Sequence, residues 1–128
     1  MIAEEKIENQ ISYSIRGAAF KIYNDLGPGL LESVYETVLK HLLISEGYIA
    51  ESQVALPVIY QEVKLDLGFR LDLLINDKVI IEIKSVETLL PVHHKQLLTY
   101  LKLTNKKLGL LINFNEEPLK IVRIANNL

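Results

Sequence analysis

The sequence predicts a mixed α/β domain in which helices cover a central β-sheet. Three observations predict this fold class. Two N-terminal segments repeat apolar residues every three or four positions, as amphipathic helices do. Two strand-like segments enclose a polar turn in the middle of the chain, with one further strand before them. A helical segment then leads to two final strands, so the order is α-α-β-β-β-α-β-β over a single domain of residues 1–128.

The N-terminal segments predict helices over residues 4–24 and 31–46. The first helix would bury a stripe formed by Ile7, Ile11, Ile15, Ala18 and Ile22. The second helix would bury Leu31, Val34, Val38 and Leu42, with Leu39 as a further member. A Gly-Pro-Gly run at residues 27–29 separates the two helices, and Gly47 ends the second one.

The first half of the sheet follows from strand and turn signals. Residues 53–60 predict a strand, and Pro57 places it at a sheet edge or at a bulge, because proline lacks a backbone donor. A turn-like polar stretch then leads into the two central strands, which lie within residues 68–87.

The second half of the chain predicts one helix and two strands. Pro91 opens the helix, which covers residues 92–103, since proline fits a first helical turn. Residues 108–114 are almost continuously apolar, which predicts a strand that is covered on both faces. Residues 119–125 form the last strand.

Composition is that of an ordinary globular protein and excludes several kinds of site. Hydrophobic residues make up 49% and charged residues 23% of the chain. There is no cysteine, so thiol catalysis, disulfides and thiolate zinc sites are excluded. No apolar run approaches the roughly 20 residues of a membrane span, and the charged first ten residues do not resemble a secretion signal. We therefore expect a cytoplasmic protein without a membrane partner.

The net charge of −2 bears on nucleic acid as a partner. A basic surface is the usual footprint of a nucleic-acid-binding protein. Setting aside Glu32, Asp72 and Glu82, which belong to the site described below, 13 of the 16 acidic residues remain against 14 Lys and Arg. Charge therefore weakens the expectation of a nucleic-acid partner without excluding it.

The two central strands carry the residues that point to chemistry. Side chains alternate across a strand, so each strand has one apolar face. These faces consist of Leu71, Leu73 and Ile75 on the first strand and of Val79, Ile81 and Ile83 on the second. The register that unites the two faces also brings Asp72 beside Glu82, with Lys84 on the same side. Burying two carboxylates in apolar strands is costly unless a cation compensates their charge. Metal-assisted cleavage of a phosphodiester is chemistry that uses such a trio of residues.

A purely structural interpretation of the trio also stands. Lys84 would then pair with Asp72 or Glu82 on a solvated sheet face, as opposite charges on neighbouring strands commonly do. Against it, Leu74 and Ile80 lie on the same face, which is therefore partly covered. Two carboxylates also leave an excess of negative charge over one lysine. From the hairpin alone, both interpretations remain open.

Four further residues each have a functional and a structural interpretation. Gln96 and Tyr100 share one helix face, where Gln96 would bond the lysine or a phosphate and Tyr100 would contact substrate, or both would form a polar flank. Glu32 lies in a first helical turn, where the helix dipole explains it without any function. Tyr35 is most simply a core or boundary aromatic residue.

With these motifs in order, the chain resembles the PD-(D/E)xK nuclease superfamily. The residues that carry the likeness are Asp72, the Glu82-Ile83-Lys84 tripeptide, and the Gln96-x-x-x-Tyr100 pair seen in RecB-type members. More closely, the chain resembles small bacterial and archaeal proteins named for a GxxExxY motif, present here as Gly29, Glu32 and Tyr35. The likeness covers nearly the whole chain and implies a restriction-endonuclease-like fold.

The resemblance also implies a role for each residue. The metal ligands would be Asp72, Glu82 and the Ile83 carbonyl, with Glu32 completing or orienting the metal shell. The catalytic residues would be Lys84, Glu82, Asp72 and Gln96, with Gln96 as the helper of the lysine. Tyr100 and Tyr35 would bind substrate or pack against the site.

Two features depart from the motif or lie outside it. Leu71 stands before Asp72, where the superfamily name has a proline, which is a common departure. His93 and His94 begin the third helix near the site, but the resemblance needs neither as a ligand. We expect both of them, and His41, at the surface, and no two of them have a zinc spacing.

The implied function is hydrolysis of nucleic acid, with DNA favoured, in the presence of Mg²⁺ or Mn²⁺. An all-oxygen site suits these hard ions, which activate a bound water for attack on phosphorus. Lys84 would stabilise the developing charge, because acting as a base would require its pKa to fall far below about 10.4.

Two alternatives remain. The first is a catalytically silent nuclease-like module that binds nucleic acid or a protein partner. The second is a structural protein whose polar hairpin face is an interface. The small size of the chain favours a homodimer or a larger complex, with the strand around Pro57 and the first helix as the surfaces that would pair.

Overall fold

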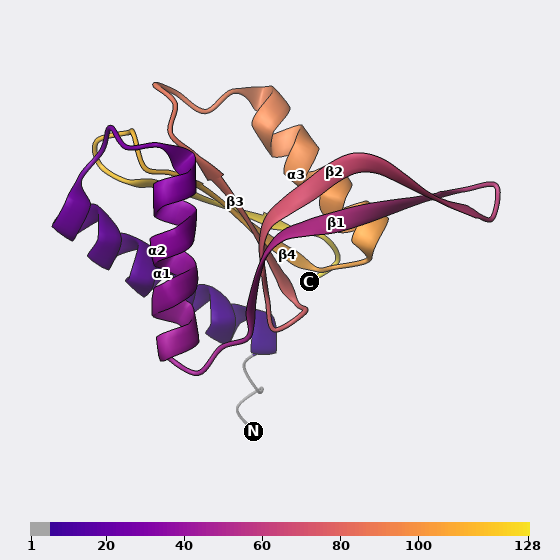
Figure 1. Cartoon of the computed structure of the whole chain (residues 1–128), viewed down its shortest axis with the longest axis horizontal. Coiled ribbons are helices and arrows are strands. Elements are labelled where there is room, and N and C mark those ends of the chain that lie inside the picture. The colour runs from indigo at the N-terminus through magenta and orange to yellow at the C-terminus, as the bar shows by residue number, and fades with distance from the viewer. Residues whose placement is uncertain (1–5) are drawn as a thin grey trace.

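The computed structural model describes residues 6–128, which form one five-stranded sheet with helices on both of its faces (Figure 1). The elements in chain order are α1 (Ile7–Leu26), α2 (Glu32–Ser45), β1 (Ala50–Tyr60), β2 (Val63–Ile75), β3 (Val79–Lys84), α3 (Pro91–Thr104), β4 (Leu108–Asn113) and β5 (Lys120–Ala125). The predicted fold class and element order are confirmed.

The strands lie in the spatial order β1-β2-β3-β4-β5. β3 and β4 are parallel, because α3 carries the chain back between them, and the other neighbouring strands are antiparallel. As predicted, β4 is buried along its whole length. β3, which carries Glu82 and Lys84, therefore lies inside the sheet between β2 and β4.

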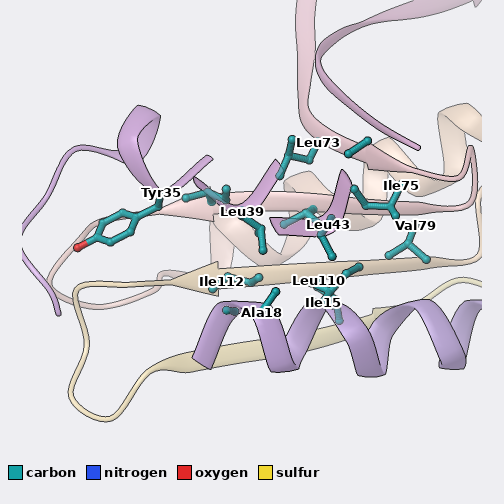
Figure 2. Close-up of a cluster of buried hydrophobic side chains, with 14 of the residues drawn as sticks. Ile15, Ala18, Tyr35, Leu39, Leu43, Leu73, Ile75, Val79, Leu110 and Ile112 are labelled. Atoms are coloured by element: carbon teal, nitrogen blue, oxygen red, sulfur yellow. The ribbon is translucent and has the colours of Figure 1, made fainter. Parts of the chain in front are cut away.

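The larger of two hydrophobic clusters lies between the sheet and the helices α1 and α2 (Figure 2). The residues of α1 in this cluster are Ile11, Ile15, Ala18, Ala19 and Ile22. The predicted α1 stripe is therefore confirmed except for Ile7, which is 54% exposed at the helix start. Residues 4 and 5, the beginning of the predicted first helix, lie outside the described residues.

The inward face of α2 differs from the prediction. Its buried residues are Tyr35, Leu39 and Leu43, whereas Leu31 is 74% exposed. Leu31 is the N-cap of the helix and so precedes its first turn. Val34 is also exposed, and Val38 and Leu42 only flank the core. The apolar residues of α2 cover a wide part of its surface, so the sequence is compatible with more than one orientation of the helix about its axis. In the observed orientation the ring of Tyr35 is buried.

The smaller cluster packs beneath α3 on the opposite face of the sheet. It consists of Leu56, Leu71, Leu74, Ile80, Leu97, Tyr100, Leu101 and Leu111. Leu97 sits directly over Gly109 of β4, where a Cβ atom would lie 2.9 Å from the Leu97 Cδ1 atom. The prediction that Leu71 shares a face with Leu73 is wrong, because Leu71 packs in this smaller cluster and Leu73 in the larger one.

Beyond the pair Ala55–Arg70, β1 and β2 continue as a two-stranded arm that extends away from the helices (Figure 1). The predicted turn-like stretch is in fact the tip and the first strand residues of this arm, since Gln61 and Glu62 form the turn and β2 begins at Val63. Pro57 lies in the edge strand β1 at a shift of register, as predicted. The arm exposes apolar side chains on Ile59, Tyr60, Val63, Leu65, Leu67 and Phe69.

Across residues 6–128, no helix has the length and apolar character that crossing a membrane requires.

Candidate functional site

β2 and β3 part at the predicted pair of carboxylates. The pairing between the two strands ends at Leu73 of β2 and Ile81 of β3. One residue further, the Asp72 N–H donates to Glu82 Oε2 at 3.4 Å, and the Ile83 N–H donates to Asp72 Oδ2 at 2.8 Å. Each carboxylate thus accepts from a backbone donor that the parting strands no longer pair. The structure brings Asp72 and Glu82 together in the fork between the two strands.

Glu82 is the buried member of this pair. Its side chain is only 5% exposed, and no ion pair within residues 6–128 includes it. Burial, followed by the hydrogen bond and the charge of Asp72, raises the pKa of Glu82 from 4.5 to about 9, although the charge of Lys84 acts in the opposite direction. Without a bound cation, the raised pKa favours the protonated form of Glu82 at neutral pH.

Lys84 and Tyr100 complete the side of the fork that faces α3. Lys84 is half-buried, and among the described residues its ammonium group makes no ion pair. Tyr100 is 7% exposed, and its ring lies 6.2 Å from that of Phe69. Burial and the nearby charges of Glu82 and Asp72 raise the pKa of Tyr100. Gln96 lies one turn earlier on α3 and is exposed.

An open pocket of about 540 Å³ lies on the other side of Asp72, where the start of α2 meets β1 and the end of β3. Its lining residues are Leu30, Leu31, Glu32, Ser33, Glu36, Gln53, Asp72 and Ser85. Asp72 therefore belongs both to the carboxylate pair and to the pocket wall.

Hydrogen bonds join the loop before α2 to the end of β3. The Ser85 N–H donates to Glu32 Oε1 at 3.3 Å, and the Ser85 hydroxyl donates to the Leu30 carbonyl at 2.7 Å. The buried amide of Asn113 pairs with both the N–H and the carbonyl of Val86. Glu32 is thereby held at the rim of the pocket.

Tyr35 lies inside the core rather than in the pocket (Figure 2). Its ring stacks on Phe114 with centroids 4.3 Å apart. Its hydroxyl donates to the Gly27 carbonyl at 2.6 Å and accepts from the Leu30 N–H at 3.1 Å. Of its two predicted roles, this geometry supports packing. Tyr35 shapes the turn that carries Glu32.

Glu36 and Gln53 are pocket residues that the sequence reasoning missed. Glu36 follows Glu32 by one helical turn, and Gln53 lies on β1 opposite Asp72. Gln53 Nε2 donates to Glu36 Oε1 at 2.7 Å and approaches Asp72 Oδ1 at 3.5 Å. Burial raises the pKa of Glu36, while the hydrogen bond from Gln53 lowers it and the charge of Asp72 raises it further. The i, i+4 spacing of Glu32 and Glu36 was the one available signal.

The histidines take no part in the fork. His93 Nδ1 accepts from the Leu90 N–H at 3.0 Å and so caps α3, and His94 Nδ1 lies 3.1 Å from the Leu90 carbonyl. Both are half-buried rather than fully at the surface, because they fold back on the helix start. His41 is exposed, as predicted.

The donor atoms of the fork fit a hard divalent cation. Across residues 6–128, no three His, Asp or Glu side chains gather closely enough to hold an ion by themselves. Asp72 and Glu82 do converge, whereas Glu32 bonds to Ser85. Mg²⁺ is commonly held by one or two carboxylates together with waters and substrate phosphates. The buried carboxylate of Glu82 and the half-buried carboxylate of Asp72 are a donor set of this kind.

Comparisons with known proteins agree with this geometry. The chain can be superposed over its whole length on 71% of a solved chain titled "Crystal structure of SSO0001", with a TM-score of 0.56 and 22% sequence identity, which shows a shared fold. No curated protein matches the sequence. The family model of the PD-(D/E)XK nuclease superfamily matches residues 9–124, nearly the entire chain. The chain therefore belongs to the PD-(D/E)XK nuclease superfamily.

Proposed function

We propose that this protein is a metal-dependent nuclease that hydrolyses phosphodiester bonds of nucleic acid, with DNA as the favoured substrate, from one domain spanning residues 1–128. The observation that carries the proposal is the contact between Asp72 and the buried Glu82 where β2 and β3 part. Within the superfamily we assign the chain to the GxxExxY group, on the strength of Gly29, Glu32 and Tyr35.

In this proposal Asp72 and Glu82 hold one Mg²⁺ or Mn²⁺ ion, with the Ile83 carbonyl as a third ligand. When bound, such an ion lowers the pKa of a water and polarises a phosphoryl oxygen. A cation bound here would favour the ionised form of Glu82, whose pKa burial and Asp72 otherwise raise to about 9. Glu32 orients the rim of the site through Ser85.

The remaining residues act on the substrate. Lys84, without a partner carboxylate in the described structure, stabilises the charge that develops on the phosphoryl oxygens. Gln96 lies exposed on the same helix as Tyr100, and in this proposal it bonds Lys84 or a phosphate. Tyr100 borders the carboxylates and contacts the substrate backbone near them.

The alternative is a nuclease-like module that binds nucleic acid or a protein without cutting, alone or as a homodimer. The exposed apolar arm formed by β1 and β2 is the feature that favours it, since such surfaces mark interaction sites. A silent module has no reason to keep a buried carboxylate, that of Glu82, in contact with Asp72, so we favour the enzyme.

The metal requirement of the proposal is tested by melting. Adding Mn²⁺ should raise the melting temperature, because a ligand that binds only the folded state stabilises it by RT ln(1 + [L]/Kd), about 2.7 kcal/mol at 100 times Kd. Asp72→Asn should abolish this rise. Glu51→Gln, which removes an exposed acid of β1 outside the pocket, should keep it. A melting temperature of the wild-type protein that does not change with Mn²⁺ or Mg²⁺ would contradict the proposal.

A further inference from the structure

Gln53 has a backbone conformation that strand residues rarely adopt. Its φ angle is +52°, in the left-handed region, although its neighbours Ser52 and Val54 pair regularly with Leu73 and Leu71 of β2. Non-glycine residues in this region are uncommon, and they persist where surrounding contacts hold them. Gln53 stands directly across from Asp72, at the point where β2 begins to leave β3.

The conformation directs the amide of Gln53 into the space between two carboxylates. Nε2 donates to Glu36 Oε1 at 2.7 Å and lies 3.5 Å from Asp72 Oδ1. The other oxygen of Asp72, Oδ2, accepts from the Ile83 N–H at 2.8 Å. Asp72 is therefore approached by a donor from each neighbouring strand, one on each of its oxygens.

These contacts fix the direction in which Asp72 presents its lone pairs. The carboxylate of an aspartate turns about two side-chain bonds, and a ligand geometry is reproducible only if outer partners restrict that rotation. Glu36, anchored on α2, holds the Gln53 amide in turn. The chain of contacts runs from α2 through β1 to β2, so three elements set the orientation of one carboxylate.

We propose that Gln53, held by Glu36, is a positioning residue that orients Asp72 for divalent metal binding. The inference rests on the proposed function. It adds two residues, Glu36 and Gln53, that do not touch the metal themselves. It also gives a reason for the left-handed backbone at Gln53, since an extended residue there would aim its side chain elsewhere.

The test is the affinity for Mn²⁺, measured by electron paramagnetic resonance on the protein without nucleic acid. Gln53→Met keeps the length of the side chain and removes its amide donor. Because losing an outer partner of a ligand typically costs 10- to 100-fold in metal affinity, we expect Gln53→Met to weaken Mn²⁺ binding about tenfold. Gln61→Met is the matched control, since Gln61 also has a left-handed φ, +49°, but lies at the tip of the arm.

The outcomes separate this inference from the function on which it rests. Weaker Mn²⁺ binding by Gln53→Met, with a metal-free melting temperature like that of Gln61→Met, supports positioning rather than a role in folding. Wild-type Mn²⁺ affinity in Gln53→Met, when Asp72→Asn has lost it, overturns the inference and leaves the metal site intact. Absence of Mn²⁺ binding by the wild-type protein overturns the proposed function and this inference together.

Discussion

Replacing Lys84 with alanine is expected to abolish metal-dependent cleavage while leaving metal binding nearly unchanged. Lys84 is half-buried beside Glu82, and its ammonium group has no carboxylate partner among the described residues. A cation of this kind is available to the phosphoryl group, where charge develops in the transition state. Removing one such group from a preorganised site costs roughly 10²–10³ in kcat.

The comparison requires single-turnover cleavage rates and Mn²⁺ affinities for the wild-type protein and two variants. Lys95→Ala serves as the control, because Lys95 is an exposed lysine on α3. We expect its rate to stay close to that of the wild-type protein. If Lys84→Ala lost metal binding together with cleavage, the division of labour between Lys84 and the carboxylates would be wrong.

Replacing Glu82 with glutamine is expected to stabilise the metal-free protein and to abolish cleavage. The folded-state pKa of Glu82 is raised from 4.5 to about 9. Between these values the folded state binds the proton more tightly than the unfolded state, so the free energy of unfolding falls as pH rises through this window. At pH 7 the wild-type protein has lost on the order of 3 kcal/mol relative to pH 4 through this group alone.

Glutamine at position 82 cannot ionise, so the variant should lack this pH dependence. Urea unfolding at several pH values, with a chelator present, measures the effect. The stability gap between Glu82→Gln and the wild-type protein should widen from pH 5 to pH 9, and saturating Mn²⁺ should narrow it by stabilising only the wild-type protein. A gap that stays constant with pH would show that Glu82 is ionised in the metal-free fold.

The fold and the centre of the site were predictable because they follow from short-range patterns. Alternation along two neighbouring strands sets a register, and only the register that unites the apolar faces aligns Asp72 with Glu82. The pairs Leu73–Ile81 and Leu74–Ile80 have that register. The buried strand β4 is likewise predictable, since a strand covered on both faces is apolar throughout.

The outer parts of the site depend on long-range geometry that leaves little trace in the sequence. Gln53 has the sequence context of an ordinary strand residue, and nothing in that context indicates its left-handed backbone, which lies where β1 pairs with β2. Glu36 looks like a solvent-facing helix residue until α2 is docked on the sheet. The arm beyond Ala55 was missed because its polar tip and alternating side chains are typical of a loop as well as of an exposed hairpin.

The central claim is that this fork of carboxylates cleaves nucleic acid. The most direct test is incubation of the purified protein with labelled single-stranded DNA, duplex DNA and RNA, each with Mg²⁺, with Mn²⁺ and with a chelator. We expect cleavage of DNA that requires the metal and disappears with the chelator. A folded protein that binds Mn²⁺ yet cleaves none of the three substrates would overturn the proposed nuclease function and favour a silent binding module.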